Sequence, residues 1–216
     1  MRAYKFLRDD MRSGYGQEGP WQVGERRVVN GDLELCVNGY HWSKDWFDAL
    51  VYARGNVAAI VEVPSRGNKM DGTKGCSRWQ RLVAAVNVAR ELRLFAVECA
   101  ERALHRECDA GREPDPRFWA ALGVARRYAD GTATVAEMDV ARAGAWAAAR
   151  GIASDVAVRA WGAAWSTARV ATRDARWAAA EAAAGDAASA AEVEWQRQRL
   201  NELLDAVFTG ARGGQR

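Results

Sequence analysis

The sequence predicts an α+β protein, in which a small N-terminal α/β sheet module packs on a larger C-terminal helical bundle rich in alanine and tryptophan. Strand-like alternation and turn residues are confined to the first third of the chain, and helix-capping patterns follow. Nearly half of residues 141–191 are alanine, the strongest helix former. We therefore expect the sheet module at 1–78, the bundle at 79–210 and a disordered tail at 211–216.

Three segments of the N-terminal module have the pattern of strands. AYKFL at 3–7 and VAAIVEV at 57–63 are short apolar runs. Between them, residues 26–42 have apolar positions on both sides of an Asn-Gly-Asp turn at 30–32, which predicts short strands joined as a hairpin. The polar, glycine-bearing stretch 65–78 is expected to be a mobile connector.

One short helix is expected between His41 and the strand at 57–63. Ser43 can cap its N-terminus, and Gly55 stands where a helix terminator is expected. The apolar side chains of this segment fall on one helical face, and they are Trp46, Ala49, Leu50 and Ala53.

The second part of the chain is predicted to be helical throughout. WQRLVAAVNVAREL (79–92) and LRLFAVECAERALHREC (92–108) are expected to be two successive helices. The alanine-rich tract 141–191 is expected to be folded, because unfolded chains are poor in aromatic residues and this tract contains tryptophans. These are Trp146, Trp161, Trp165 and Trp177.

Local signals mark the ends of two further helices. Asp115, followed by Pro116 at the first helical position, begins one helix, and Gly131 ends it. Thr134 and Glu137 have the spacing of a capping box, which begins the next helix.

The C-terminal helix has the clearest amphipathic pattern. Asp186 can cap it and Gly210 ends it. Its expected core stripe consists of Val193, Leu200, Leu203, Leu204 and Val207. Trp195 falls outside this stripe, and Arg199, four residues on, shares its face, so the pair is a candidate partner-binding patch. The alternative is that Trp195 packs beneath the sheet module.

Composition and charge argue against several classes of protein. The net charge of +3 is spread over the chain without a basic stripe, so nucleic-acid binding is not expected. No apolar run reaches the length of a membrane span, and acidic residues at positions 9 and 10 interrupt any export signal. We therefore expect a cytoplasmic protein that does not contact a membrane.

Cysteine and histidine are too sparse for an obvious metal centre. The four cysteines include no CxxC pair, and we expect them to be reduced thiols. His105 and Cys108 share a helix face, but without further histidines we expect packing there. No metal, cofactor or catalytic residue is assigned.

Two resemblances add to this prediction. LELCVNGYHW and VAAIVEV, together with AYKFLRDDMRSGYG, resemble an uncharacterised domain of bacterial and phage proteins, which implies an α/β fold for about residues 1–75. FAVECAERAL, RYADGTATVAEMDVARAGAWAAARG and EWQRQRLNELL resemble the helical immunity proteins of bacterial toxin–immunity systems, over about residues 95–205. The second resemblance implies a non-enzymatic, inhibitor-like protein of bacterial or phage conflict, whose partner is a toxin or a defence component.

One alternative places an enzyme in the N-terminal module. The Gly-x-His-x-Ser turn, with the helix and strand that follow, is similar to the NAD-binding half of ADP-ribosyltransferases. That similarity implies roles for His41, Ser43, Tyr52 and Glu62 in an enzyme or in a binder of NAD-derived nucleotides. The alternative for His41 is a structural role, held by a backbone hydrogen bond. A structural assembly protein, and homo-oligomerisation, are also left open.

Overall fold

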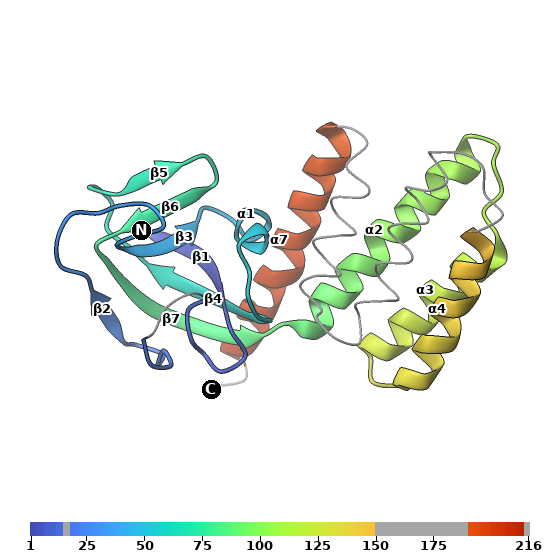
Figure 1. The fold of residues 1–216 in the computed structure, drawn as a ribbon, viewed down its shortest axis with the longest axis horizontal. Coiled ribbons are helices and arrows are strands. Elements are labelled where there is room, and N and C mark those ends of the chain that lie inside the picture. Colours follow the sequence, from blue (N-terminus) through green and yellow to red (C-terminus); the bar gives the residue numbers. More distant parts are fainter. Residues whose placement is uncertain (15–17, 150–189, 214–216) are drawn as a thin grey trace. The chain divides into compact units, whose positions relative to one another are not determined.

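The computed structural model describes residues 1–14, 18–149 and 190–213 (Figure 1). It contains two compact units. We call Met1–Val88 together with Leu200–Arg216 the sheet unit, and Ala89–Arg199 the helical unit. An antiparallel sheet in the first and helices in the second confirm the predicted α+β class.

Some of the sequence-based expectations lie outside the described residues. They concern most of the alanine-rich tract with Trp161, Trp165 and Trp177, the cap at Asp186, and residues 214–216 of the expected tail. The last helix, α7 (Ala190–Gly213), continues past its expected end at Gly210.

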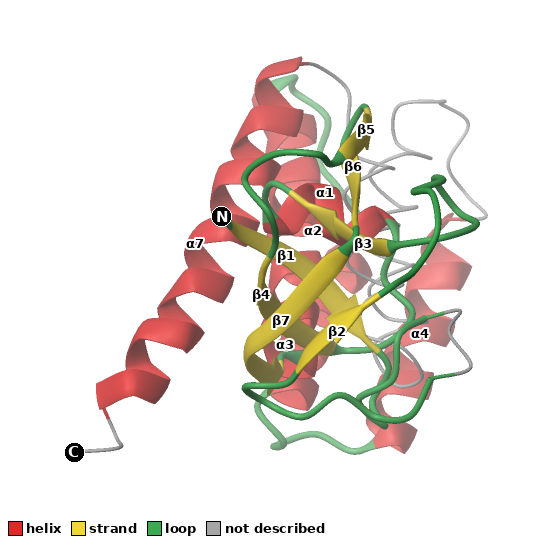
Figure 2. Ribbon diagram, turned by 90° about the vertical axis from the view of Figure 1, so that its left-hand side faces the viewer, coloured by secondary structure: helices red, strands yellow, loops and turns green. Residues whose placement is uncertain are grey.

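Seven described strands form one sheet in the order β2-β7-β4-β1-β3-β6-β5, with antiparallel neighbours throughout (Figure 2). Their bounds are β1 (Arg2–Leu7), β2 (Arg26–Val28), β3 (Tyr40–Ser43), β4 (Val57–Glu62), β5 (Lys69–Asp71), β6 (Lys74–Ser77) and β7 (Trp79–Asn87). The strands expected at 3–7 and 57–63 are confirmed as β1 and β4. β4 lies centrally and is buried along almost its whole length, which explains its continuous apolar run.

The hairpin expected around residues 30–32 is wrong. β2 pairs with β7, and residues 34–38 form a tight turn closed by a bridge between Glu34 and Asn38. The Asn38 side-chain amide donates to the backbone oxygens of Asn30 and Asp32, at 2.8 and 2.9 Å. The alternating apolar residues of this segment therefore lie in a tight turn and not in a strand.

The connector expected at 65–78 is also wrong, because this segment contains a β-hairpin. β5 and β6 pair antiparallel, and Asp71 and Lys74 close the hairpin around Gly72 and Thr73. Gly72 has a φ of 54°, in the left-handed region that such turns require. The Asp-Gly pair was the local signal for this hairpin.

The helix expected from Trp79 is instead the longest strand, β7. Its first residues alternate, with Gln80 and Leu82 buried and Arg81 exposed. Hydrogen bonding to β2 on one side and β4 on the other overrides the helical propensity of its alanines. One continuous helix, α2 (Ala89–Asp109), then replaces the two helices that were expected.

The first helix, α1 (Trp46–Val51), begins later than expected and ends earlier. Asp45 is its N-cap and accepts a 2.8 Å hydrogen bond from the Asp48 N–H, whereas Ser43 is the buried last residue of β3. Gly55 does not end this helix. A Cβ atom on Gly55 would lie 2.5 Å from the backbone oxygen of Leu7, so only glycine permits this close approach to the end of β1.

Replacing Gly55 with alanine is therefore expected to lower the melting temperature, because the backbone of β1 must shift to admit the methyl group. Gly123 provides the matched control, since it lies within a helix and has no atom near its hypothetical Cβ. Gly123→Ala should stabilise the protein by about 0.5–1 kcal/mol through helix propensity. Thermal unfolding should show a lower melting temperature for Gly55→Ala and a higher one for Gly123→Ala. An unchanged melting temperature in Gly55→Ala would contradict the close approach.

In the helical unit, local signals predicted two helices correctly. In α3 (Pro116–Ala129), Asp115 accepts from the Arg117 N–H, which confirms the cap. At the start of α4 (Val135–Ala149), Glu137 and Thr134 exchange the reciprocal hydrogen bonds of a capping box. The shared core of these helices with α2 comprises Val97, Ala100, Leu104, Phe118, Leu122, Ala125, Met138 and Ala145, among others.

Candidate functional site

A cavity of about 730 Å³ in the sheet unit brings together three of the residues singled out in the sequence. His41, Ser43 and Tyr52 all line it, together with residues of β1, of the turn before β3 and of the segment around Ser13 and Glu18. The fourth residue, Glu62, does not line this cavity; its carboxylate accepts from Arg81 at 2.6 Å.

His41 is held by the backbone of the neighbouring turn. Its Nε2 accepts a 2.9 Å hydrogen bond from the Cys36 N–H. Burial lowers the pKa of His41, and the positive charges of Lys74 and Lys5 lower it further. The imidazole is therefore neutral near pH 7, and the lone pair on Nε2 is already used.

The Cys36 thiol lies at the cavity beside an ammonium group. Cys36 adopts a φ of 66°, and its Sγ lies 3.0 Å from Lys74 Nζ. The ammonium of Lys74 also lies over the Tyr52 ring, 5.2 Å from its centroid. The thiol, the ammonium and the ring thus form one side of the cavity.

Lys5 is a cation placed where the sheet is otherwise apolar. It shares a face of β1 with Ala3 and Leu7, both fully buried. Its hydrogen-bond partners among the described residues are neutral oxygens, Gln80 Oε1 at 3.1 Å and Ser13 Oγ at 3.5 Å, and its Nζ lies over the Trp21 ring, 5.4 Å from the centroid. A lysine between two buried positions of a strand was the signal that could have identified this residue in the sequence.

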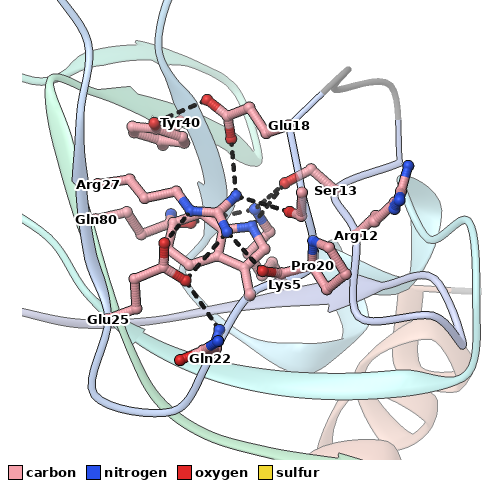
Figure 3. Close-up of polar contacts among 12 residues, drawn as sticks. Lys5, Arg12, Ser13, Glu18, Pro20, Gln22, Glu25, Arg27, Tyr40 and Gln80 are labelled. Atoms are coloured by element: carbon pink, nitrogen blue, oxygen red, sulfur yellow. Dashed lines mark hydrogen bonds and ion pairs between the residues drawn. The ribbon is translucent and has the colours of Figure 1, made fainter.

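Glu18 is positioned by a cluster around the Arg27 guanidinium (Figure 3). Arg27 donates to Glu18 at 3.2 Å and to both carboxylate oxygens of Glu25, and it lies over the Trp21 ring. Glu18 in turn accepts from the Tyr40 hydroxyl at 2.9 Å. Burial raises the pKa of Tyr40 to about 12, so the hydroxyl stays a donor. The carboxylate is therefore committed to Arg27 and Tyr40.

Lys5 should make the stability of the protein depend on pH. Burial lowers its pKa from the usual 10.5 to about 8, so the unfolded chain binds this proton more tightly than the folded chain. The cost of burying the charged ammonium is fully present below about pH 8. The free energy of unfolding should rise between pH 8 and 10.5, as Lys5 loses its proton in the folded chain.

Lys5→Met should therefore raise the free energy of unfolding at pH 7 by about 1–3 kcal/mol. The advantage over the wild type should shrink toward pH 10. Comparing the two proteins by denaturant unfolding at pH 7, 8.5 and 10 isolates Lys5 from the tyrosines and cysteines that titrate in both. A pH-independent difference would contradict the assignment.

A second candidate lies on the helices. In the helical unit the Trp195 ring lies under the Arg102 guanidinium, 4.0 Å from its centroid. Arg199 donates twice to Glu98, at 2.6 and 2.8 Å. Glu98 and Arg102 lie four residues apart on α2, and each pairs with a residue of α7; Arg102 donates to Glu192 at 3.0 Å.

The buried stripe of α7 differs from the expected one. Leu200 and Leu204 are fully buried as expected, but Val193, Leu203 and Val207 are only half-buried. The most buried residues recur every four positions, and they are Glu192, Gln196, Leu200, Leu204 and Phe208. A stripe that contains Glu and Gln cannot be recognised from hydrophobicity.

Comparison with known proteins concerns the helical candidate. Residues 86–203 match the family model described as "Imm-5 like putative immunity protein". The chain belongs to this immunity-protein family. No curated protein and no solved structure matches it significantly.

The immunity-family segment contains Trp195 and Arg199, whereas His41, Ser43, Tyr52 and Glu62 precede it. The resemblance of the first 75 residues to an uncharacterised domain has no counterpart in the comparisons. In the described part of the chain, no helix has both the length and the apolar character needed to cross a membrane.

Proposed function

We propose that this protein binds a protein toxin of a bacterial or phage conflict system and neutralises it by binding alone. Membership of the immunity-protein family, over residues 86–203, is the observation that carries the proposal. The sheet unit is given no transferase role, because the Glu62 carboxylate pairs with Arg81 and does not line the cavity that holds His41. As an intracellular antidote, the protein would act in the cytoplasm.

The proposed contact surface is the face shared by α2 and α7 around Trp195 and Arg199. Tryptophan and arginine are the residues most often found among the energetic anchors of interfaces. Here the arginines are already fixed: Arg102 by Glu192 and the Trp195 ring, Arg199 by Glu98. Side chains held in one conformation lose less entropy on binding, so this face is preorganised for a partner.

The partner is best obtained by affinity capture on the full chain and identified by mass spectrometry. Once it is purified, we expect Trp195→Ala to weaken its binding by about tenfold or more, as for an interface anchor. The matched control is Trp119→Ala, since Trp119 is a half-buried tryptophan of α3 that contacts His105.

Two results would count against this surface. One is unchanged partner affinity in Trp195→Ala. The other is a loss of several degrees in melting temperature with loss of binding, which would show that Trp195 belongs to the core of the unit.

A further inference from the structure

The cavity of the sheet unit has the size and lining of a small-molecule site. Its volume of about 730 Å³ falls within the range of about 300–1,000 Å³ that is usual for such sites. Aromatic side chains form much of its wall: Tyr4, Phe6, Tyr40, Trp42 and Tyr52. Lys5 and Lys74 contribute positive charge, and Glu18 is the one carboxylate among the described residues that line it.

The charge of Lys5 is not balanced by a direct ion pair. Its Nζ contacts the amide oxygen of Gln80 and the hydroxyl of Ser13, and it lies over the Trp21 ring, 5.4 Å from the centroid. Glu18 is near enough to favour the charged form of Lys5, but Arg27 opposes it. Because a cation that is partly removed from water is stabilised by a nearby anion, the Lys5 ammonium favours a negatively charged ligand in the cavity.

Trp42 supplies a rigid part of the aromatic lining of the cavity. Trp42 is only 2% exposed, and its indole Nε1 has no acceptor among the described residues. The indole ring lies against Gly75, where any side chain would overlap it, so the ring is fixed in place.

We propose that this cavity binds a small aromatic anion, a flat ring that carries a phosphate or a carboxylate. The anionic group compensates Lys5, and the ring lies against the aromatic side chains that line the cavity. Lys74, which lies over the Tyr52 ring, adds positive charge at the side of the cavity where Cys36 lies. The site lies in the sheet unit and does not depend on the proposed binding of a toxin by the helices.

Cys36 provides a local reporter for this site. It is exposed and lines the cavity, whereas Cys108 is exposed on α2 and serves as an internal control. The full chain is treated with iodoacetamide, and the rate of alkylation at each cysteine is followed by mass spectrometry. Adenosine 5′-monophosphate and 4-hydroxybenzoate are the anionic probes, and adenosine and phenol are their uncharged counterparts.

We expect at least one anion to protect Cys36 saturably, with no effect on Cys108 and with little protection by its uncharged counterpart. Protection by adenosine 5′-monophosphate indicates a phosphate ligand, and protection by 4-hydroxybenzoate indicates a carboxylate ligand. Lys5→Gln should raise the dissociation constant measured in this way by about 10-fold to 100-fold, as expected for loss of a charge-assisted hydrogen bond. Lys69→Gln makes the same charge change at an exposed position of β5 and should leave it unchanged.

The proposal is overturned if neither anion protects Cys36 at concentrations up to about 1 mM. It is also overturned if the uncharged counterparts protect equally, or if Lys5→Gln protein, shown to be folded by circular dichroism, binds as the wild type does. None of these outcomes bears on partner capture by the helical unit.

Discussion

Replacing Trp46 with alanine is expected to destabilise the sheet unit by about 3–5 kcal/mol. Trp46 is 1% exposed, and its ring stacks on Phe208 of α7 with 5.3 Å between ring centroids and an interplanar angle of 10°. Its indole N–H donates to Asp205 at 3.0 Å, and its backbone N–H donates to the Asn201 side chain at 2.9 Å. The single side chain thus connects α1 with the C-terminal part of α7.

Thermal unfolding measures the total effect, and hydrogen exchange at the amides of β1 and β4 assigns it to the sheet unit. Phe208→Ala provides a second probe, because a direct stack predicts non-additive effects in the double variant, with a coupling of about 0.5–1.5 kcal/mol. Strictly additive effects, or a Trp46→Ala protein that melts as the wild type does, would contradict this packing.

The second large effect is expected at Glu192, a carboxylate that is only 5% exposed. It accepts from Arg102 at 3.0 Å and from Arg106 at 2.9 Å. Replacing both arginines with methionine leaves this carboxylate buried without these cations, and should cost about 3–5 kcal/mol. Glu192→Gln should cost less, about 1–2 kcal/mol, because the side chains of Arg102 and Arg106 are 43% and 37% exposed and can be hydrated.

The test is whether the double arginine variant loses more stability than Glu192→Gln. Denaturant unfolding of both variants measures the two losses. A triple variant, with methionine at all three positions, should recover part of the loss because it also removes the buried negative charge. If Glu192→Gln is the more damaging change, burial of this charge without Arg102 and Arg106 is not the dominant cost, and the account of this cluster is contradicted.

The sequence was sufficient where the signal is local. The caps at Asp115 and Thr134 involve residues within three positions of each other. The continuous apolar run of β4 is itself the pattern of a buried strand. It was insufficient where a distant partner decides. β7 has the composition of a helix and becomes a strand because β2 and β4 pair with it. Glu192 can be buried because it forms an ion pair with Arg102, which lies 90 residues earlier in the chain.

The same distinction applies to the cavity. His41, Ser43 and Tyr52 were grouped in the sequence, with Glu62, by a similarity to ADP-ribosyltransferases, and these three line one cavity whereas Glu62 does not. Lys5 and Lys74 come from strands on either side of β3 in the sheet, so only the strand order brings them to the same cavity.

Neutralisation of a partner by binding alone is measured most directly by co-expression. The protein captured on this chain should arrest growth when it is expressed alone, and co-expression of the full chain should restore growth. The purified pair should form a stable complex in which the mass of each protein is unchanged. Growth arrest that persists despite complex formation, or inactivation accompanied by a change in the partner's mass, would contradict neutralisation by binding.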